Sequence, residues 1–473
     1  MRQQLICHHS FMGINIMQTI IPDQSFSAIL LKEETIAKLQ ARTASIGVIG
    51  LGYVGLPLAL LFAEEGFPVT GFDIDSTKIN TLLSLRSYIC RIPETEIALA
   101  SDRGFRATSD FMCVSKMDAI VICVPTPLTE YREPDLSYVT ETVKSIAPYL
   151  RAGQLVILES TTYPGTTEEI VVPLLEKGNL SGLCVSRNNP EASNVFFVAF
   201  SPEREDPGNN TVARNEIPKI VGGIDRYANE IATALYGAIF HRTVLVSSTT
   251  VAEMTKLLEN IYRCVNIALV NELKLLCLRM GMDIWEVIAA AATKPFGFQP
   301  FYPGPGLGGH CIPIDPFYLS WKAKEFDFAT RFIELAGEIN MAMPYHTVEF
   351  IAEALNVRSK ALKGSRIMVL GVSYKKDIDD LRESPAITII EALQKSGAVV
   401  VYNDPYFPKI GKGRKYDLQM QCVPLEQISR CDCVVILTDH SSYDYQRIVD
   451  EAQLVVDTRN ATSGIVSTKI VRC

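Results

Sequence analysis

The stretch ASIGVIGLGYVGLPLALLFAEEGFPVTGFDID, residues 44–75, contains two apolar runs, a glycine-rich turn and an apolar segment that ends at a glycine. The runs Ile46–Ile49 and Pro68–Phe72 predict two β-strands. Leu56–Glu65 predicts a helix between them, and Gly66 ends it. A strand, a helix and a second strand in this order predict one βαβ unit, the building block of a parallel sheet.

The turn between the first strand and the helix has the pattern G-x-G-x-x-G. Its members are Gly50, Leu51, Gly52, Tyr53, Val54 and Gly55. In such a turn Gly50 permits the sharp change of direction, Gly52 lets a pyrophosphate approach the backbone, and Gly55 lets the helix pack closely on the strand. The phosphates would lie at the helix N-terminus, where free N–H groups and the helix dipole favour anions.

Two further residues sharpen this prediction. Asp73 ends the second strand, at the position where a carboxylate accepts a hydrogen bond from a ribose 2′-hydroxyl. A carboxylate there repels a 2′-phosphate, so NAD is the expected cofactor and NADP is disfavoured. Lys78, near the start of the next helix, is expected to help hold the ribose edge.

The rest of the chain repeats this alternation. Strand-like runs at Ala119–Val124 and Leu155–Leu158 flank a helical stretch at Ser137–Leu150, and the segment 365–404 forms a second βαβ unit without the glycine pattern. The expected fold is α/β, with two Rossmann-like domains of doubly wound parallel sheet joined by a long central helix. The expected bounds are 1–43 for an N-terminal extension, 44–240 for the NAD-binding domain, 241–345 for a central helical dimerisation domain, and 346–473 for a C-terminal domain.

The central helix is expected over residues 251–280, which contain neither glycine nor proline. Apolar residues such as Met254, Leu257, Leu258 and Ile261 recur at helical spacing along it. A helix of this length can join two domains and bury an apolar face against a second subunit, so a homodimer or larger homo-oligomer is expected.

Composition excludes several classes of protein. The 473 residues are 48% hydrophobic and 21% charged, with a net charge of −8, which argues against a partner that is nucleic acid or an anionic membrane. Residues 1–24 lack the apolar block of a signal peptide, and no apolar run is long enough to span a membrane, so a soluble, cytoplasmic protein is expected. The twelve cysteines include no C-x-x-C pair, and no metal site is expected. Most of them sit in apolar stretches, but Cys311 lies among glycines and prolines.

Seven motifs, in this order, resemble the UDP-glucose/GDP-mannose dehydrogenase family. They are GLGYVGLPLA (50–59), VPTP (124–127), ESTTYPGTT (159–167), SPER (201–204), AEMTKLLEN (252–260), PGLGGHCIPIDP (305–316) and SYKKDIDDLRESPA (373–386). The segment 294–319 is most similar to the UDP-N-acetyl-D-glucosamine 6-dehydrogenase branch. The resemblance implies an N-terminal NAD domain, a C-terminal UDP domain, a dimer built on the central helix, and a role in cell-surface polysaccharide synthesis.

The implied reaction oxidises a sugar C6 alcohol to a carboxylate with two NAD per sugar. A nucleophile must hold the intermediate aldehyde, and Cys311 suits this role through a thiohemiacetal and a thioester. His310 either lowers the pKa of that thiol or points away from it. The resemblance implies further catalytic groups: Lys256 for the C6 alkoxide, Asn260 to orient the alkoxide, Asp315 for the water that hydrolyses the thioester, and Glu203 and Thr161 to position that water or the sugar.

The resemblance also implies binding residues. Those expected along NAD, besides the glycine turn, Asp73 and Lys78, are Val124, Pro125, Thr126, Thr161 and Arg382. Those expected along the UDP-sugar are Glu203, Arg204, Lys256, Asn260, Gly308, Lys375 and Arg459. From composition alone, Lys375 and its neighbours equally fit a solvated run of charge.

The sugar itself is left open between several candidates. The UDP-glucose branch usually has a lysine between the cysteine and the aspartate, where this chain has Ile314, and an arginine upstream that is missing between Arg279 and Arg331. Aromatic residues such as Phe296 and Tyr302 suit a bulkier 2-substituent such as N-acetyl, which favours UDP-N-acetylglucosamine. UDP-glucose, UDP-N-acetylmannosamine and UDP-N-acetylgalactosamine are the alternatives, and a catalytically silent nucleotide-sugar binder is disfavoured because the cysteine and the helix lysine are both present.

Overall fold

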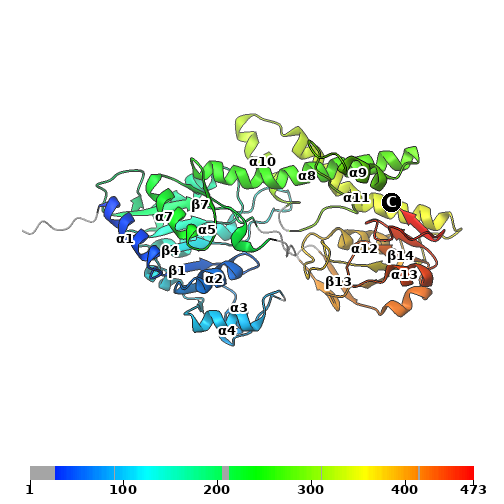
Figure 1. Ribbon diagram of the computed structural model, residues 1–473, viewed down its shortest axis with the longest axis horizontal. Helices are drawn as coiled ribbons and strands as arrows, with labels where there is room; N and C mark the ends of the chain where they lie inside the picture. Colours follow the sequence, from blue (N-terminus) through cyan, green and yellow to red (C-terminus); the bar gives the residue numbers. More distant parts are fainter. Residues whose placement is uncertain (1–26, 90, 205–211, 310–311, 414–415) are drawn as a thin grey trace, which may run out of the picture.

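The computed structural model describes residues 27–89, 91–204, 212–309, 312–413 and 416–473. The predicted nucleophile Cys311 and its neighbour His310 lie outside the described residues. Two α/β halves stand at opposite ends of an elongated molecule, and one long helix, α8, runs along both of them (Figure 1). The fold prediction is therefore confirmed: two Rossmann-like halves are joined by a long central helix.

The N-terminal half is built on a nine-stranded sheet of order β3-β2-β1-β4-β5-β7-β8-β9, with β6 paired to β7. The strands are β1 (Ile46–Ile49), β2 (Val69–Phe72), β3 (Arg106–Thr108), β4 (Ala119–Ile122), β5 (Leu155–Leu158), β6 (Cys184–Val185), β7 (Val195–Phe200), β8 (Lys219–Gly223) and β9 (Thr243–Leu245). All pairings are parallel except that between β7 and β8, which is antiparallel. A fully parallel sheet was expected. The difference arises between β7 and β8, where the described residues form only a short 3₁₀ turn, whereas a parallel return needs a crossover helix.

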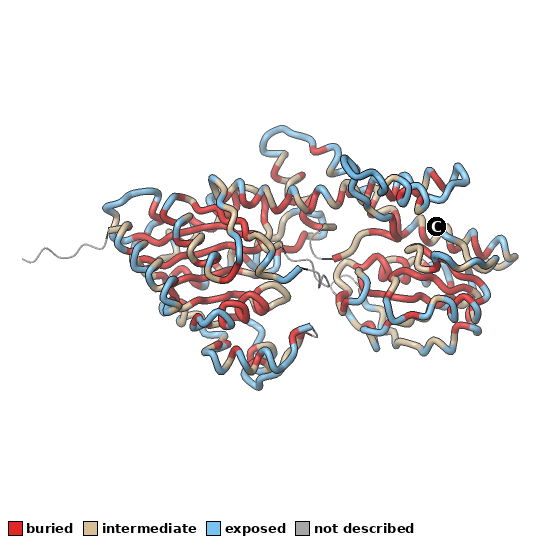
Figure 2. The backbone as a smooth tube through the Cα atoms, viewed as in Figure 1, coloured by how far each residue is buried: buried red, intermediate tan, exposed pale blue. Residues whose placement is uncertain are grey.

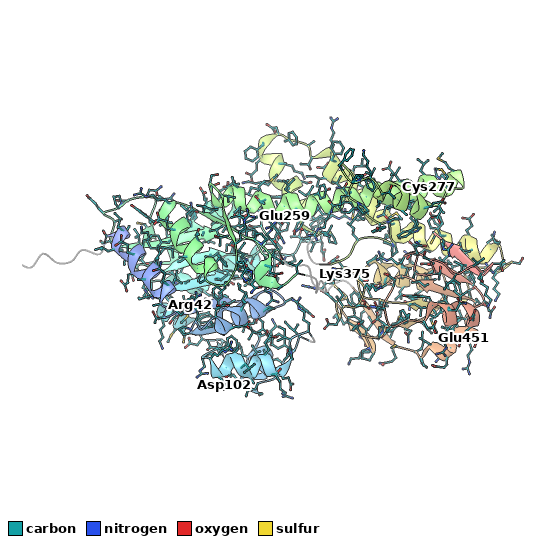
Figure 3. All side chains as sticks on the ribbon, viewed as in Figure 1. Arg42, Asp102, Glu259, Cys277, Lys375 and Glu451 are labelled. Atoms are coloured by element: carbon teal, nitrogen blue, oxygen red, sulfur yellow. The ribbon has the colours of Figure 1, made fainter. Side chains whose placement is uncertain are left out.

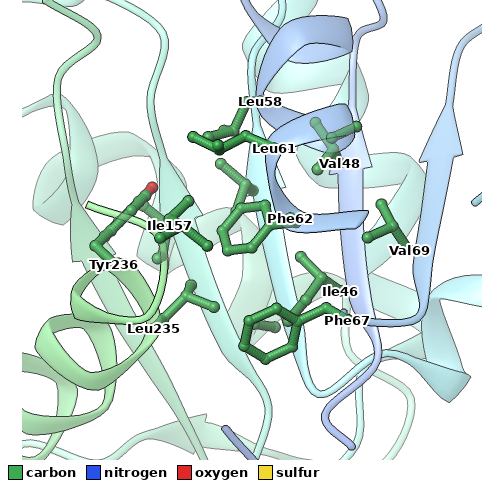
Figure 4. Close-up of a cluster of buried hydrophobic side chains, with 14 of the residues drawn as sticks. Ile46, Val48, Leu58, Leu61, Phe62, Phe67, Val69, Ile157, Leu235 and Tyr236 are labelled. Atoms are coloured by element: carbon green, nitrogen blue, oxygen red, sulfur yellow. The ribbon is translucent and has the colours of Figure 1, made fainter. Parts of the chain in front are cut away.

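The central strands of this sheet are buried on both faces, which explains why they are almost continuous runs of valine, isoleucine and leucine. The helices that cover the sheet are α1 (Ala28–Gln40), α2 (Gly55–Glu64), α3 (Ser76–Leu83), α4 (Glu94–Asp102), α5 (Ser137–Ile146), α6 (Val172–Gly178) and α7 (Arg226–Gly237). Figure 4 shows Phe62 and Leu61 of α2 packed with Leu235 and Tyr236 of α7 over Ile46 and Ile157. This core fixes the carboxyl ends of the strands, where ligands bind in such sheets.

Helix α8 (Thr249–Met280) is the structural link between the halves. The Ser248 side chain accepts from the N–H of Val251 at its start, and Gly281 ends it with a φ of 71°. Its 32 residues span about 48 Å at 1.5 Å per residue. It is followed by α9 (Ile284–Ala292), α10 (Asp315–Ala323) and α11 (Arg331–Asn356), and α11 packs along α8.

The C-terminal half has a five-stranded parallel sheet of order β11-β10-β14-β15-β16 and a separate antiparallel pair, β12-β13. The elements are β10 (Arg366–Leu370), α12 (Pro385–Lys395), β11 (Val399–Asn403), β12 (Lys409–Lys412), β13 (Asp417–Gln421), β14 (Cys433–Ile436), α13 (Tyr445–Glu451), β15 (Val455–Asp457) and β16 (Ile470–Arg472). Buried backbone is concentrated in the two sheets, whereas the segment around α9 and the loop after it is mostly exposed (Figure 2).

Among the described residues, no helix has both the length and the apolar character needed to cross a membrane.

Candidate functional site

The N-terminal half has a cavity of about 500 Å³ at the carboxyl ends of β1, β2, β4 and β5. Twelve residues singled out in the sequence line it: Gly50, Gly52, Tyr53, Val54, Asp73, Lys78, Val124, Pro125, Thr126, Thr161, Glu203 and Arg382. These come from seven separate segments of the chain, so the fold gathers the predicted cofactor residues around one space. Neither Leu51 nor Gly55 lines it, since Leu51 is buried and Gly55 packs its helix against the turn.

The glycine turn has the geometry that a dinucleotide requires. Gly50 has a φ of 90°, in the left-handed region that glycine adopts without strain. A Cβ added at Gly55 would overlap the carbonyl of Gly50, so the helix can start here only with glycine. At Gly52 an added Cβ would meet no atom within 4 Å, which leaves open space directly above the backbone at the start of α2. The turn therefore fits a pyrophosphate at the helix N-terminus.

Asp73 ties the end of β2 to this turn. Its Oδ2 atom accepts from the N–H of Leu51 at 2.9 Å and from Nζ of Lys78 at 3.0 Å, and its Oδ1 atom accepts from the N–H of Asp75 at 2.9 Å. The side chain is 6% exposed and lines the cavity. Asp73 thus places a carboxylate at the cavity wall, and Lys78 pairs with that carboxylate.

A second group of polar side chains lies next to this cavity, on the first half of α8 and at the start of α10. Lys256, Asn260 and Asp315 are all at most 5% exposed. Nζ of Lys256 donates to the carbonyl of Glu203, a residue that lines the cofactor cavity. The Asn260 amide donates to Oδ2 of Asp315, which begins α10. The cavity and the α8 group are therefore directly joined through Glu203.

Burial changes the acidity of this group. It raises the pKa of Asp315 to about 6, although Lys256, the Asn260 amide and Arg263 act in the opposite direction. A carboxyl group with a pKa near 6 can exchange a proton close to neutral pH, which suits general acid–base chemistry.

Comparison with known proteins identifies the family of the chain. Residues 44–240 match the NAD-binding domain of the UDP-glucose/GDP-mannose dehydrogenase family, residues 250–342 match its central domain, and residues 368–464 match its UDP-binding domain. The chain belongs to this family. It is an NAD-binding member, and its resemblance to UDP-sugar dehydrogenases extends over nearly the whole length.

Three relatives show the range of the family near this chain. An NDP-N-acetyl-D-galactosaminuronic acid dehydrogenase of Ralstonia solanacearum is 35% identical over 89% of this chain and 96% of its own length. A UDP-N-acetyl-D-glucosamine 6-dehydrogenase of Pseudomonas aeruginosa is 35% identical over 84% and 91%. The structure of a UDP-D-ManNAc dehydrogenase from Pyrococcus horikoshii superposes with a TM-score of 0.80, at 33% identity, over 90% of this chain and 98% of that one.

The remaining predicted substrate residues of this family member lie apart from the cofactor cavity. Arg204 pairs with Glu259 on α8, with Nε at 3.2 Å from Oε2, and its Nη1 donates to the carbonyl of Pro218 at 2.7 Å. Arg459 follows β15, and its Nε donates to the carbonyl of Leu437 at 2.9 Å. Figure 3 shows Glu259 on α8 and Lys375 at the inner edge of the C-terminal half, facing the gap between the halves.

Gly308 lies where the loop before α10 meets the C-terminal half. An added Cβ there would overlap the side chain of Tyr374, and the N–H of the next residue, Gly309, donates to the carbonyl of Arg382 at 3.0 Å. Gly308 was expected to lie along the UDP-sugar. The structure instead shows the glycines in close contact with the loop that carries Lys375, and the contact with substrate stays a prediction.

Arg382 connects the two halves of this family member. Its guanidinium donates to Asp380 in three bonds of 3.0, 2.9 and 2.6 Å, and it stands 4.7 Å from the centre of the Tyr53 ring. Tyr53 belongs to the glycine turn, so a C-terminal residue closes over the cofactor turn of the N-terminal half. A second cavity of about 630 Å³ lies beside this contact and is shared between the halves.

Two charged residues next to Lys256 and Asn260 were not singled out in the sequence analysis. Arg263 donates to Oδ1 of Asn260 at 2.6 Å and so orients the amide toward Asp315. Glu253, one turn before Lys256, is fully buried and accepts from the N–H groups of Gly165 and Thr167 at 2.6 and 2.9 Å. Both residues lie on α8, and their helical spacing from Lys256 was the feature of the sequence that could have identified them.

Among the described residues, no group of histidine, cysteine, aspartate and glutamate side chains is arranged to hold a metal ion. The predicted nucleophile, Cys311, lies outside those residues, four positions before Asp315 in the sequence.

Proposed function

We propose that this family member oxidises the C6 hydroxyl of a UDP-N-acetylhexosamine, with UDP-N-acetyl-D-glucosamine as the first candidate, to the uronate. The observation that carries the proposal is the bond from Lys256 to the carbonyl of Glu203, because it joins the cofactor cavity to the buried group on α8. A substrate C6 atom placed between the cofactor cavity and the buried group on α8 would be within reach of the cofactor and of Lys256. NAD, when bound, supplies the hydride acceptor for each of the two oxidations.

The residues have separate tasks in this proposal. Lys256 stabilises the alkoxide at C6 or accepts its proton, and Asn260 holds the oxygen in line. The Cys311 thiolate adds to the aldehyde, which gives a thiohemiacetal, and loss of a second hydride leaves a thioester. Water then attacks the thioester with Asp315 as general base, which releases the carboxylate and restores the thiol. Glu203 and Thr161 are expected to position this water or the sugar.

The binding residues follow the same division. We assign the glycine turn, Asp73, Lys78, Val124, Pro125, Thr126, Thr161 and Arg382 to NAD. We assign Glu203, Arg204, Lys256, Asn260, Gly308, Lys375 and Arg459 to the UDP-sugar. The named relatives act on gluco-, galacto- and manno-configured N-acetyl sugars, and they support an N-acetyl group more strongly than a particular configuration.

The stoichiometry tests the proposal directly. NADH formed per sugar consumed should be two with UDP-N-acetylglucosamine, and the rates with UDP-glucose, UDP-N-acetylgalactosamine and UDP-N-acetylmannosamine should be lower. One NADH per sugar would overturn the four-electron reaction. A higher kcat/KM for another of the four sugars would replace the first candidate by that sugar.

We also propose that the enzyme works as a homodimer, in the cytoplasm, in the synthesis of cell-surface polysaccharide. Exposed apolar side chains repeat along the outer face of α8, among them Leu258, Leu269, Leu273 and Leu276, which are 38–59% exposed. Such a face favours a second copy of the same helix. Light scattering should give twice the chain mass, and Leu273→Glu should lower it; an active wild-type monomer would contradict the dimer.

A further inference from the structure

A buried ion pair lies beneath the cofactor cavity, and the proposed reaction does not use it. Glu159 follows β5 and Lys219 begins β8; their side chains are 1% and 5% exposed, and Nζ contacts Oε1. The Tyr236 hydroxyl donates to Oε2 of Glu159 at 3.1 Å. The ammonium group stands 4.9 Å from the centre of the Tyr236 ring and 5.5 Å from that of Phe240. Burial of such a pair loses solvation that the attraction only partly restores, so a position at the floor of a binding cavity calls for an explanation.

The pair has a defined orientation relative to the cavity. Glu159 lies in the wall of the cofactor cavity, where Cys123 contacts its Oε2 atom, whereas Lys219 does not line this cavity. Lys219 borders a second, small pocket together with Glu159 and Glu203. Glu159 is therefore the member of the pair that lies nearer to the cofactor cavity, with Lys219 on its far side. A fixed pair of opposite charges in this orientation produces a negative potential in the nearby part of the cavity.

The position along the cavity indicates which part of NAD meets this potential. Asp73 and Lys78 mark the end over β2, where the adenosine ribose is recognised. Cys123, Glu159 and Glu203 mark the other end, beyond β4, β5 and β7. In a sheet that binds a dinucleotide across its middle, the second nucleotide half lies over these strands. Glu159 thus borders the nicotinamide end.

We propose that the Glu159–Lys219 pair makes the site selective for the oxidised cofactor. The nicotinamide ring carries a positive charge in NAD⁺ and none in NADH, so a carboxylate facing it stabilises NAD⁺ alone. The consequence is weaker retention of NADH after each hydride transfer. Glu159 acts on binding and takes no proton or hydride itself, and the inference needs only that the cavity binds NAD.

The test compares dissociation constants for NAD⁺ and NADH, measured by fluorescence titration and competition on the full-length protein. Glu159→Gln removes the negative end and leaves the cation, and should raise Kd for NAD⁺ about tenfold while Kd for NADH changes less than about twofold. Glu159→Gln/Lys219→Met removes both charges and should raise Kd for NAD⁺ about threefold. The double variant leaves no unpaired buried charge, so it decides the question even where the single variant does not fold.

Asp118 provides a matched control in the same sheet. It is a buried carboxylate that pairs with Arg151 at 2.7 Å and accepts from the N–H of Ser45 at 2.9 Å, at the opposite, amino end of β4. Asp118→Asn should lower the melting temperature and leave the ratio of the two dissociation constants unchanged. A parallel loss of affinity for NAD⁺ and NADH in the Glu159 variants would show a structural role and overturn the proposal, as would an unchanged ratio.

Discussion

The two α/β halves start with the same βαβ arrangement and use its first turn differently. In the N-terminal half the N–H of Leu51, after β1, donates to Asp73 at the end of β2, at 2.9 Å. In the C-terminal half the N–H of Val372, after β10, donates to Asp404 beyond the end of β11, at 2.7 Å. The backbone bond is equivalent, since in both cases a strand-end carboxylate fixes the turn of the neighbouring strand.

The difference lies in what surrounds the carboxylate and how soon the helix begins. Helix α2 starts at Gly55, directly after the turn, whereas α12 starts only at Pro385, after a loop that carries Lys375 and Arg382. Asp404 is completed by His440, whose Nε2 stands 3.1 Å from Oδ2. In the N-terminal half, the short turn leaves the N-terminus of α2 open to phosphates. In the C-terminal half, the longer loop before α12 carries Lys375 and Arg382, and Arg382 reaches the Tyr53 ring of the other half. The first βαβ unit therefore forms a dinucleotide site in the N-terminal half, and in the C-terminal half it carries a loop of charged residues.

The largest expected effect is that of replacing Cys311, which lies between the two α/β halves in the sequence. Cys311→Ala should lower steady turnover by about three orders of magnitude or more, because nothing remains to capture the aldehyde. Cys311→Ser should still form an ester, which hydrolyses more slowly than a thioester. Intact-mass analysis with UDP-N-acetylglucosamine and excess NAD should then show an adduct for serine and none for alanine. An alanine variant that keeps most of its activity would mean that the covalent mechanism is wrong.

The open space at Gly52 provides the next test of the comparison. An added Cβ at Gly52 meets no atom within 4 Å, so Gly52→Val should change the free energy of unfolding by less than about 1 kcal/mol. Its side chain would occupy the space of the pyrophosphate, and Kd for NAD should rise about 50-fold or more. Gly411→Val in β12 is the control, since Gly411 also has open space around it but lies in the other half. Equal loss of NAD affinity in both variants would contradict a cofactor site confined to the N-terminal half.

The two strand-end carboxylates should respond differently to removal. The wild type should prefer NAD to NADP by about tenfold or more in kcat/KM, and Asp73→Ala should narrow that gap, because no carboxylate then repels the 2′-phosphate. Asp404→Ala should leave the ratio unchanged and cost about 3 kcal/mol of stability, since it leaves buried N–H groups and His440 without their acceptor. Kinetics with NAD and NADP measure the cofactor preference, and urea unfolding measures the stability. A wild type that uses NAD and NADP equally would contradict the assigned role of Asp73.

The smallest expected effect is a pH dependence at the junction. The Asp315 pKa is raised to about 6, and its ionised form is the proposed general base, so kcat should fall about twofold at pH 6 and tenfold per unit below it. Asp315→Asn should abolish this acid limb and lower kcat throughout. The sign for stability is opposite: because the folded pKa lies above the unfolded one, the stabilisation is present at low pH and is lost as pH rises through about 6. An acid limb that persists in the asparagine variant would assign it to another group.

The local features of the site were predictable because they depend on short stretches of chain. The glycine turn, Asp73 and the spacing of Lys256 and Asn260 follow from strand and helix periodicity. In the structure the turn and Asp73 lie at one cavity, Lys256 and Asn260 lie on α8, and their roles stay predictions. The prediction of a second βαβ unit was likewise confirmed. The antiparallel pairing of β8 with β7 was not predicted, because the sequence analysis extended the parallel pattern of the first strands to the whole sheet.

The sequence by itself determined the α/β class, the NAD fingerprint and the order of the family motifs, since each of these is encoded by residues close together in the chain. Tertiary structure alone decided the pairings between distant charges. Glu159 pairs with Lys219, which lies sixty residues later in the chain, and Arg204 pairs with Glu259. Asp404 forms a hydrogen bond with His440. No periodicity encodes such partners. They are set by which buried charges the packed sheets and α8 bring within hydrogen-bond distance, because a partner offsets part of the free-energy cost of burying a charge.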